Sequence, residues 1–531
     1  MTYAILLTSA LGVFASSVQA QLAQPPAGVS EGLLKELINA CPANPDLANL
    51  DTSPVWSGWG GAGNARFQAQ AAAGLTPADV PKLKLKWAFG LPGGKSMYSQ
   101  PSVAFGRVFI GNDNGVVYSL DAKTGCLYWA YQADMFGRFA PIAAPISGYP
   151  GTPYAIFFVT RSTTAYALGA HDGTLLWKTQ VRIGLNNLSA TAAFHDGRIY
   201  VPMSGTETLV GADLKYECCR SRGALAALDA NTGKVLWRTE SIPEPLRQLG
   251  ENANGVQRWG PAGASIWNTP TVDSKRGLIY VGTGNSFGRI AAATSDSILA
   301  LRMSDGKMMW HHQEFQGDAF MARCQATNGA DSNCPEKLGP DYDFGGSSAI
   351  LQTADGKDIL LAAGKGGVAI ALDPDKEGKL LWRTQLWESQ APSASGLVVW
   401  GGAADGAHVY YPLQQPGGGL KALDIKTGKL DWNAAINADR RGQASPASVI
   451  PGVVFTGGWD GILRAVGADG KVIWSFSAVR DFDTVNHVPA TGGSFGSAGP
   501  VIAGGMVFAA SGYPGTLRGT PGNVLLAFGV E

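Results

Sequence analysis

The chain has 531 residues, and its 41 Lys and Arg balance 41 Asp and Glu, so the formal net charge is zero. This balance argues against nucleic acid or an anionic membrane surface as a partner, because both attract an excess of basic residues. The 71 Gly, the 15 Trp and a charged fraction of 15% favour many short strands joined by tight turns. After about residue 55 no linker-like tract divides the chain, which favours one large repeat-built domain.

The first twenty residues, MTYAILLTSALGVFASSVQA, join an apolar stretch to a small-residue end at Val18-Gln19-Ala20. This arrangement predicts a signal peptide over 1–20, cleaved before Gln21, and leaves 21–55 as an N-terminal extension. Because no Lys or Arg lies near Met1, a short membrane anchor is the alternative. No later segment offers the roughly 18 apolar residues that a membrane-spanning helix requires. We therefore expect an exported, soluble protein in the bacterial periplasm.

The cysteines are six in number, an even count that suits an oxidising compartment: Cys41, Cys126, Cys218, Cys219, Cys324 and Cys334. We expect Cys324 and Cys334 to bridge within one loop, which leaves Cys41 with Cys126. The adjacent pair Cys218-Cys219 can close only a small strained ring. The residues alone leave open whether these two bond to each other or remain two free or separately paired thiols. None of the six forms the Cys-x-x-Cys-His motif of covalent haem.

A sequence motif, here called the phrase, recurs along the chain with the form Ala-Leu-Asp-x-x-Thr-Gly-Lys-x-x-Trp. It is clearest in SLDAKTGCLYW, ALDANTGKVLW and ALDIKTGKLDW. Its tryptophans are Trp87, Trp129, Trp177, Trp237, Trp310, Trp382, Trp432 and Trp474. Each phrase is an alternating strand, a Gly-containing turn and a second strand, which is typical of a β-hairpin. Intervals of roughly 40 to 75 residues leave room for four strands, the size of one propeller blade.

The two ends of the chain carry complementary halves of this phrase. Leu83–Trp87 has the Trp half alone, whereas residues 525–531, LLAFGVE, have the other half. Joined, they make one blade and close a ring that has no exposed sheet edge. We therefore predict an all-β fold over 56–531, an eight-bladed β-propeller with Trp-docking repeats whose last blade is closed by N- and C-terminal strands.

Polar residues that interrupt the repeat mark where function is expected. The interruptions are Ser204–Glu207 with the Cys218-Cys219 run, Trp267 with Asn285, the loop ending Asp341–Gly346, and Lys365. Each one alone is more typical of an ordinary turn or surface residue. Because successive blades point equivalent loops at one end of the central channel, we expect them to converge. Two carboxylates and an amide oxygen are hard ligands suited to Ca²⁺, and a metal beside a base is typical of a catalytic site.

Taken together, these features resemble the pyrroloquinoline quinone (PQQ) dependent alcohol dehydrogenases over roughly residues 55–531. The resemblance depends on the Trp repeat, the adjacent cysteines, the Ser-Gly-Thr-Glu segment, Trp267 eighteen residues before Asn285, and Asp343-Phe344. Within that family, Tyr216–Cys219 and Asp341–Gly346 are most similar to the enzymes that act on polyvinyl alcohol.

The resemblance implies a role for each interrupting residue. Glu207 and Asn285, with Asp343, would bind Ca²⁺ beside the quinone, and Asp343 would be the catalytic base, with Asp341 as the alternative. Trp267 would lie beneath the PQQ rings, and a Cys218–Cys219 disulfide would lie above them. Further contacts with the cofactor are expected from Lys365, Arg138, Ser189 and Thr191, and Trp400 and Asn486 are candidates for completing the pocket.

The function implied is a periplasmic PQQ- and Ca²⁺-dependent dehydrogenase that oxidises secondary alcohol groups to ketones. Its substrate would be an alcohol, possibly polymeric in the manner of polyvinyl alcohol, and its electrons would pass to a soluble cytochrome c. One alternative keeps the cofactor but takes a sugar or a small primary alcohol. A second alternative, from another class, is a non-catalytic propeller scaffold of outer-membrane assembly.

Overall fold

The computed structural model describes residues 39–47, 49–50, 53–324, 331–387, 398–436, 442–515 and 519–530. The expected signal peptide at 1–20 and most of the 21–55 extension lie outside these residues. Among the described helices, none has the length and apolar character needed to cross a lipid bilayer.

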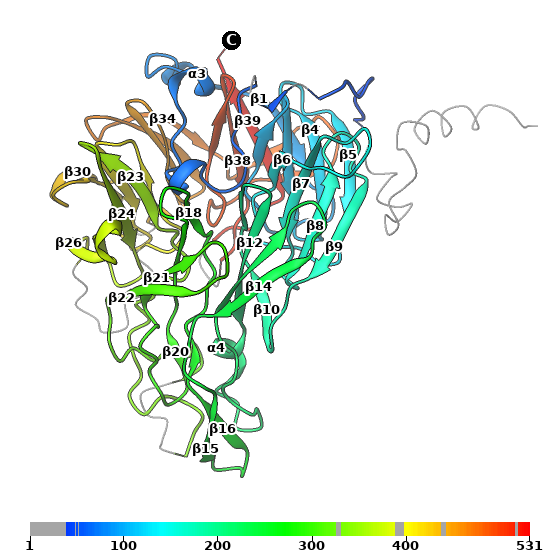
Figure 1. Ribbon diagram of the computed structural model, residues 1–531. Helices are drawn as coiled ribbons and strands as arrows, with labels where there is room; N and C mark the ends of the chain where they lie inside the picture. Colours follow the sequence, from blue (N-terminus) through cyan, green and yellow to red (C-terminus); the bar gives the residue numbers. More distant parts are fainter. Residues whose placement is uncertain are drawn as a thin grey trace, which may run out of the picture.

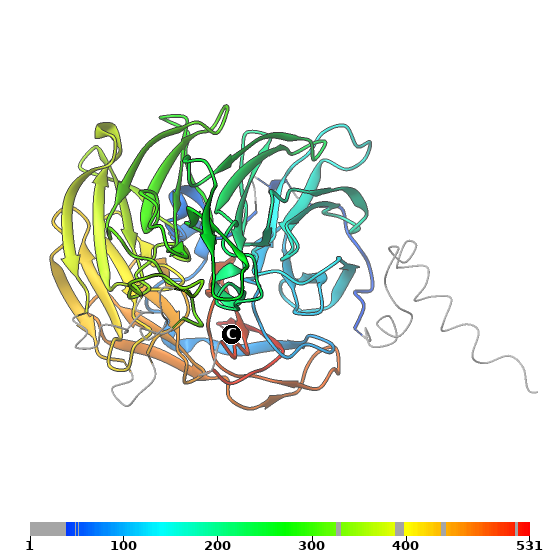
Figure 2. The same cartoon turned by 90° about the horizontal axis from the view of Figure 1, so that it is seen from below.

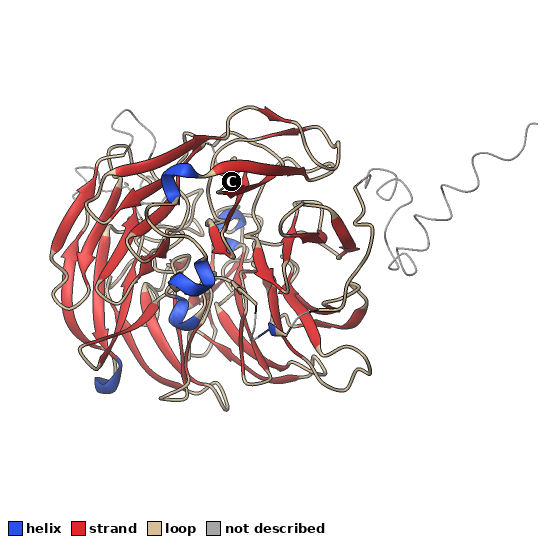
Figure 3. Ribbon diagram, turned by 90° about the horizontal axis from the view of Figure 1, so that it is seen from above, coloured by secondary structure: helices blue, strands red, loops and turns tan. Residues whose placement is uncertain are grey.

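Within the described residues, eight antiparallel sheets surround a central channel, which confirms the predicted eight-bladed propeller (Figure 1). Seen along the other axis, the sheets follow one another around the ring in chain order (Figure 2). Strands make up nearly all of the regular structure (Figure 3). The first strands of neighbouring blades contact one another and line the channel.

Blades 1 to 4 are built from the first half of the chain. Blade 1 comprises β2 (Ser102–Ala104), β3 (Arg107–Gly111), β4 (Val116–Asp121) and β5 (Leu127–Gln132). Blade 2 comprises β6 (Ile142–Pro145), β7 (Tyr154–Val159), β8 (Thr164–Gly169) and β9 (Leu175–Gln180). Blade 3 has β10 (Asn186–Ser189), β11 (Ala193–His195), β12 (Arg198–Gly205), β13 (Ala224–Asp229) and β14 (Val235–Glu240). Blade 4 comprises β18 (Thr271–Asp273), β19 (Leu278–Gly282), β21 (Ser297–Arg302) and β22 (Met308–Gln313).

Blades 5 to 8 follow. Blade 5 comprises β23 (Ile350–Ala354), β24 (Lys357–Ala363), β25 (Val368–Asp373) and β26 (Lys379–Gln385). Blade 6 comprises β27 (Ala403–Ala404), β28 (His408–Pro412), β29 (Leu420–Asp424) and β30 (Leu430–Ala434). Blade 7 comprises β31 (Ser448–Ile450), β32 (Val453–Gly457), β33 (Ile462–Gly467) and β34 (Val472–Ser477). Blade 8 comprises β37 (Val501–Ala503), β38 (Met506–Ser511), β39 (Val524–Gly529) and β1 (Lys84–Gly90).

Blade 8 closes the ring as the two half-phrases predicted. Its outer strand β1 pairs antiparallel with β39, in a register that sets Lys84 opposite Gly529 and Gly90 opposite Val524. The preceding blade is joined to it by Trp474, whose indole Nε1 donates a hydrogen bond of 3.0 Å to the carbonyl of Leu83. Both ends of the propeller are thus paired, and neither presents an open edge.

Each repeated tryptophan lies on the outer strand of its blade, and seven of the eight pack on a glycine in a turn of the next blade. At the first such contact, a Cβ on Gly125 would come within 2.8 Å of the Trp87 indole, and Gly125 has a φ of 72°. Only Gly fits a turn with that left-handed backbone and that close approach. The same pairing recurs at Gly173 with Trp129, Gly233 with Trp177, Gly306 with Trp237, Gly378 with Trp310, Gly428 with Trp382 and Gly470 with Trp432. The repeat therefore holds the blades together.

Small accessory elements extend from the ring. The described helices are η2 (Ala62–Asn64), α3 (Gln70–Ala73), η3 (Val80–Lys82), α4 (Glu207–Val210) and η4 (Pro374–Lys376). The two-stranded ribbons pair β15 (Arg247–Glu251) with β16 (Gln257–Gly260), β17 (Ala262–Gly263) with β20 (Ser286–Phe287), and β35 (Asp481–Phe482) with β36 (Ala490–Thr491). Figure 1 shows α4, β15, β16 and β20 forming a lobe at one end of the propeller, opposite α3. Loops at this lobed end carry the repeat-interrupting residues.

The segment Trp56–Gln68 crosses the central channel. It bonds to blades 1, 4, 6 and 7: Trp56 bridges to Val103, Asn64 Nδ2 donates to Thr271 Oγ1, Ala65 O accepts from Ala404 N, and Gln68 N donates to Val449 O. Arg66, near the end of this segment, is fully buried and donates to Trp59 O, Gln100 Oε1 and Ser448 Oγ at 2.7 Å each. Burial without a carboxylate partner among the described residues lowers the pKa of Arg66 to about 9.

Candidate functional site

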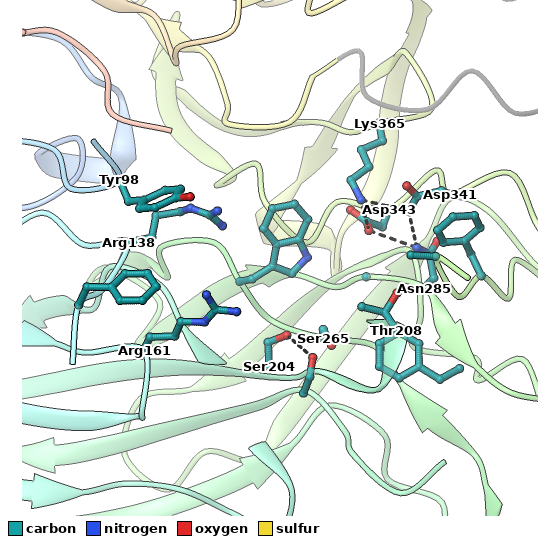
Figure 4. A pocket seen from close by; sticks show the side chains of 17 residues that line it. Tyr98, Arg138, Arg161, Ser204, Thr208, Ser265, Asn285, Asp341, Asp343 and Lys365 are labelled. Atoms are coloured by element: carbon teal, nitrogen blue, oxygen red, sulfur yellow. Dashed lines mark hydrogen bonds and ion pairs between the residues drawn. The ribbon is translucent and has the colours of Figure 1, made fainter. Parts of the chain in front are cut away.

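A cavity of about 370 Å³ opens at the lobed end of the channel, where loops of blades 1 to 5 converge (Figure 4). Asn285, Asp341, Asp343 and Lys365 lie along one side of it. Tyr98, Phe136, Arg138 and Arg161 also line it, and Figure 4 shows both arginines on the side facing Asp343 and Lys365. Side chains from five blades therefore share one recess, as the equivalent-loop argument predicted.

Two carboxylates in this cavity share the same two hydrogen-bond donors. Asn285 Nδ2 donates to Asp341 Oδ1 at 2.6 Å and to Asp343 Oδ2 at 3.3 Å. The Lys365 ammonium donates to the same two oxygens at 3.0 and 2.9 Å. Asp343 is also held at its other oxygen, because the backbone N–H of Gly345 donates to Oδ1 at 3.1 Å. The pair is thus fixed in a position where its oxygens face the cavity.

Burial and charge act in opposite directions on these groups. Burial raises the pKa of Asp343 to about 6, while the Lys365 ammonium lowers it and the Asp341 carboxylate raises it. Burial alone would lower the pKa of Lys365, but the Asp343 and Asp341 carboxylates raise it above its ordinary value. Lys365 therefore stays charged, and a further cation nearby would favour the ionised form of Asp343.

Trp267 presents its indole to the cavity because two glycines leave room for it. A Cβ on Gly345 would lie 2.0 Å from Trp267 Nε1, and one on Gly346 would lie 2.4 Å from the six-membered ring. The backbone N–H of Trp267 donates to Gly345 O at 3.1 Å. The Lys365 ammonium lies 5.0 Å from the centre of the indole, and Trp400 packs edge-on against it at 5.5 Å. This geometry makes Trp267 a flat surface for a planar ligand.

Arg138 and Arg161 give the facing side of the cavity an excess of positive charge. Neither forms an ion pair with a carboxylate in the described part of the chain. The Arg138 guanidinium stacks on Trp400 at 4.2 Å, and its buried Nε has no hydrogen-bond partner there. Burial and then the neighbouring Arg138 lower the pKa of Arg161. An anionic ligand would relieve both costs.

Glu207 is buried nearby but does not line the cavity. Its carboxylate accepts hydrogen bonds from Arg220 N, Ser221 N, Ser221 Oγ and Tyr216 OH, at distances from 2.6 to 3.2 Å. The structure therefore brings together Asn285, Asp343, Lys365 and Trp267 of the expected site, and it places Glu207 against the chain that follows the adjacent cysteines.

The structure contains the expected disulfides Cys41–Cys126 and Cys324–Cys334, and it also bonds Cys218 to Cys219. Cys218 and Cys219 are buried in an apolar cluster with Phe287, Met321 and the Cys324–Cys334 pair. Neither of the adjacent cysteines lines the cavity, whereas Phe287 does. The disulfide therefore supports the cavity wall from behind that ring.

Two further expected residues, Thr191 and Asn486, do not line the cavity among the described residues, and a third, Ser189, cannot be placed. Thr191 Oγ1 accepts a hydrogen bond from Ala140 N at 2.9 Å, and Asn486 binds both backbone groups of Gly90. Ser189 belongs to β10, but its side chain is outside the described part of the structure. The sequence interpretation missed Arg161, Tyr98 and Ser265, which line the cavity. The only feature of the sequence that could have identified Arg161 is that a basic residue occupies the turn joining two strands of blade 2.

The site fits a hard divalent cation. Asn285 is 5% exposed, and its Oδ1 is buried and finds no hydrogen-bond partner among the described residues. The nitrogen of the same amide donates to Asp341 and Asp343, so an amide oxygen without a described partner lies within one side chain of two carboxylates, and both are oxygen ligands of the kind that Ca²⁺ prefers. No cluster of three or more His, Cys, Asp or Glu suited to a metal occurs in the described ranges.

Known proteins resemble this chain in sequence and fold. Residues 56–321 match the family described as PQQ: Glucose/ethanol/alcohol dehydrogenase, beta-propeller domain. A polyvinylalcohol dehydrogenase from Sphingopyxis sp. (strain 113P3) is 40% identical over 526 residues, covering 92% of this chain and 79% of that protein. Another, from Pseudomonas sp., is 39% identical over 515 residues, with coverages of 91% and 78%. Quinohemoprotein alcohol dehydrogenase from Comamonas testosteroni shares the fold, with a TM-score of 0.63, 19% identity and coverages of 97% and 84%.

Proposed function

Because this chain belongs to the PQQ-dependent alcohol dehydrogenases, and to their polyvinyl alcohol dehydrogenase type, we propose that it oxidises secondary alcohol groups of a polyvinyl alcohol-like substrate to ketones. The observation that carries this proposal is the meeting of Asp343, Asn285 and Lys365 beside the half-buried indole of Trp267, which lines the cavity. A base, an oxygen ligand, a cation and a flat surface there share one cavity.

The cavity suits the quinone in shape and charge. PQQ is planar and carries three carboxylates, so it needs a flat contact and cations around its edge. Trp267 offers the flat contact, and Arg138, Arg161 and Lys365 offer the cations. The Cys218–Cys219 disulfide, proposed to lie above the rings, would act through Phe287. When bound, PQQ and Ca²⁺ would supply the electron-accepting carbonyl and the Lewis acid that polarises it.

Asp343 is the proposed catalytic base. Its Oδ1 is held by Gly345 N–H, and its Oδ2 faces the cavity beside Lys365. The carboxylate takes the proton of the substrate hydroxyl, a role that typically contributes roughly 10²–10⁴-fold to the rate. Lys365 keeps it ionised and oriented, and Asp341 stands beside it as the alternative base. Ca²⁺ is proposed to bind at Asn285 and Asp343, with Glu207 as the third ligand that the family pattern implies.

The location of the protein and its electron acceptor are also proposed. Residues 1–20 would direct export to the periplasm, with 21–55 as an extension and 56–531 as the catalytic propeller. A soluble cytochrome c is proposed as the electron acceptor, because a haem takes one electron at a time and a quinone would be able to release its two electrons singly. Export is checked by locating the full-length protein in fractionated cells and by sequencing its mature N-terminus, which should begin at Gln21.

Reconstitution tests the function directly. Purified protein would be mixed with PQQ and Ca²⁺, and reduction of a redox dye would be followed with propan-2-ol, vinyl alcohol oligomers, polyvinyl alcohol, ethanol and glucose. We expect turnover that requires PQQ and is highest with the secondary alcohols. Asp343→Asn, which keeps the shape of the side chain, is the matched inactive control. Turnover only with glucose or ethanol would replace the substrate class, and no PQQ-dependent turnover with any alcohol would refute the enzyme itself.

A further inference from the structure

We propose that Asp134 is a positioning residue for Arg161, because its carboxylate fixes the turn between β7 and β8 that aims the Arg161 guanidinium at the cavity. This inference rests on the proposed function, in which Arg161 offers a positive charge to the edge of PQQ. Asp134 itself is exposed, lies between β5 and β6, and does not line the cavity. Any effect that it has on the site therefore passes through the turn.

The β7–β8 turn, residues 160–163, has the same backbone hydrogen bonds as the corresponding turns of three other blades. Thr160 N donates to Thr164 O at 2.9 Å, and Thr163 N donates to Thr160 O at 3.0 Å. The same two bonds occur in the turns that begin at Asn112, Gly364 and Gly458. Arg161 and Lys365 therefore occupy the second position of equivalent turns in blades 2 and 5, and both line the cavity.

The last position of this turn is strained in blade 2, unlike in the other three blades. Those blades have Gly there, with φ values of 83°, 69° and 73° at Gly115, Gly367 and Gly461. Blade 2 has Thr163, with a φ of 64°. A β-branched residue rarely adopts this left-handed conformation, and such a residue persists only where its surroundings hold it. The turn that carries Arg161 therefore depends on contacts that the other turns do not need.

Asp134 supplies such contacts from outside the turn. Its Oδ1 accepts a hydrogen bond from Thr160 Oγ1 at 2.9 Å, and its Oδ2 accepts from Ser162 Oγ and Thr164 Oγ1 at 2.8 Å each. Burial alone would raise the pKa of Asp134, but these three hydroxyl groups lower it below its ordinary value. The carboxylate is therefore ionised at neutral pH, and hydrogen bonds to an ionised group are stronger than those between neutral groups.

Arg161 lies between two of the residues that Asp134 holds. Its backbone N–H donates to Phe136 O at 2.8 Å, and its guanidinium lies 5.4 Å from the centre of the Phe136 ring. Figure 4 shows the side chain pointing into the cavity. Ordering a long Arg side chain costs conformational entropy, and a backbone that is already fixed lowers the cost of binding a ligand there. Asp134 therefore pre-organises Arg161 without contacting the ligand.

The test is a double-mutant cycle on PQQ binding, measured by quenching of tryptophan fluorescence in the full-length protein. The four proteins are wild type, Asp134→Ala, Arg161→Ala and the double variant. We expect Asp134→Ala to weaken PQQ binding about three- to tenfold when Arg161 is present, and less than about twofold when Arg161 is already replaced by Ala. A role exerted through Arg161 requires this coupling, whereas a general loss of structure would weaken binding equally in both backgrounds.

A second measurement needs no cofactor. Amide hydrogen exchange in the 160–164 turn should be faster in Asp134→Ala than in wild type, because the turn loses three hydrogen bonds to the carboxylate. Asp424→Ala is the matched control, because Asp424 accepts from Thr427 Oγ1 at 2.8 Å in an exposed turn of blade 6. That variant should leave both the PQQ Kd and the exchange of the 160–164 turn unchanged.

The possible outcomes separate this inference from the proposed function. Equal weakening of PQQ binding by Asp134→Ala in both backgrounds, or unchanged exchange in the turn, would overturn the inference and leave the proposed function in place. If Asp134→Ala fails to fold, Thr164→Val removes one donor to the carboxylate and should show the same coupling to Arg161, more weakly. Absence of PQQ binding by the wild-type protein would refute the proposed function and, with it, the role of Arg161.

Discussion

Lys365 and Asp343 form a buried ion pair in which the ammonium lies 2.9 Å from Asp343 Oδ2, with the two side chains 16% and 5% exposed. The same ammonium lies 3.0 Å from Asp341 Oδ1. One ammonium therefore compensates the charge of two carboxylates at the wall of the cavity. The stability of the site should depend on whether another cation compensates them when Lys365 is removed.

Replacing Lys365 by Met should destabilise the metal-free protein and make it more responsive to Ca²⁺. Removing one partner of a buried pair typically costs about 3–5 kcal/mol, because the remaining charge is uncompensated. Bound Ca²⁺ would supply that compensation and stabilise the folded form by mass action. The measurement is the unfolding temperature with EDTA and with Ca²⁺. Equal Ca²⁺ shifts in Lys365→Met and wild type would contradict this account, and Lys426→Met, from an exposed pair, is the control.

Gly345→Ala should displace the Trp267 indole and weaken PQQ binding. The new methyl group would lie 2.0 Å from Trp267 Nε1, so the ring has to move. We expect at least about tenfold weaker PQQ binding, a loss of roughly 1.4 kcal/mol, measured by quenching of tryptophan fluorescence. Gly284→Ala lies in the same cavity but makes only ordinary contacts of 3.5 Å or more, so it should bind PQQ nearly normally. Equal affinities in the two variants would show that the indole position is unimportant.

Arg161→Ala and Arg138→Ala should each weaken PQQ binding, although the sequence identified only Arg138. A hydrogen bond to a charged group contributes about 1.5–3 kcal/mol, which corresponds to roughly 10–150-fold in affinity. Lys at either position should restore part of the loss, because it keeps the charge but loses the fork of N–H donors. PQQ titrations at low and high salt check this, with Arg302→Ala on the surface as the control. Unchanged affinity in Arg161→Ala would remove it from the cofactor site.

Asp296→Asn should be more stable than wild type, and the difference in their free energies of unfolding should grow as the pH rises. Burial first, and then Asp318 and Asp343, raise the pKa of Asp296 well above its ordinary value, and neither of its oxygens has a partner among the described residues. The folded protein therefore retains a proton that the unfolded chain releases above about pH 4. The free-energy cost of keeping this proton in the folded wild-type protein is absent below that pH. It grows as the pH rises, until the pKa of Asp296 in the folded state is passed.

The stability of Asp296→Asn relative to wild type should thus increase as the pH rises above the pKa of an aspartate in the unfolded chain, about 4. Asn also tolerates the φ of 52° at this position. Denaturant midpoints at several pH values measure the difference. Exposed Asp305, whose pKa is lowered to about 2 by Arg302, should show no such gain when changed to Asn. A difference that stays constant with pH would contradict the assignment of a retained proton to Asp296.

The blades could be predicted because their chemistry is local and repeated. Each Trp and the Gly on which it packs belong to equivalent positions of neighbouring phrases, so the contact between Trp87 and Gly125 is visible in the sequence. Closure by β1 and β39 could be predicted for the same reason. Trp267, Asn285 and Lys365 stood out because they interrupt that regular pattern, and they do meet in the cavity.

The direction in which a side chain points could not be predicted. Glu207 and Asp341 are both carboxylates near repeat-interrupting motifs, yet one faces backbone N–H groups and the other faces the cavity. That difference depends on a few dihedral angles set by the long run through Cys218-Cys219. Arg161 was missed because it lies in a short turn, where a basic residue is more often exposed than functional.

The Trp56–Gln68 segment limits how a polymer reaches the cavity. Because this segment bonds to blades on opposite sides of the channel, it lies across the propeller axis in the described part of the chain and would obstruct a long polymer there. Substrate and ketone product must therefore use the same mouth at the lobed end. A polyvinyl alcohol chain would lie across that mouth and present its hydroxyl groups from the side, so that interior units are as accessible as chain ends. Successive oxidations would then depend on lateral sliding or on release and rebinding, and oxidised units should be scattered along the polymer.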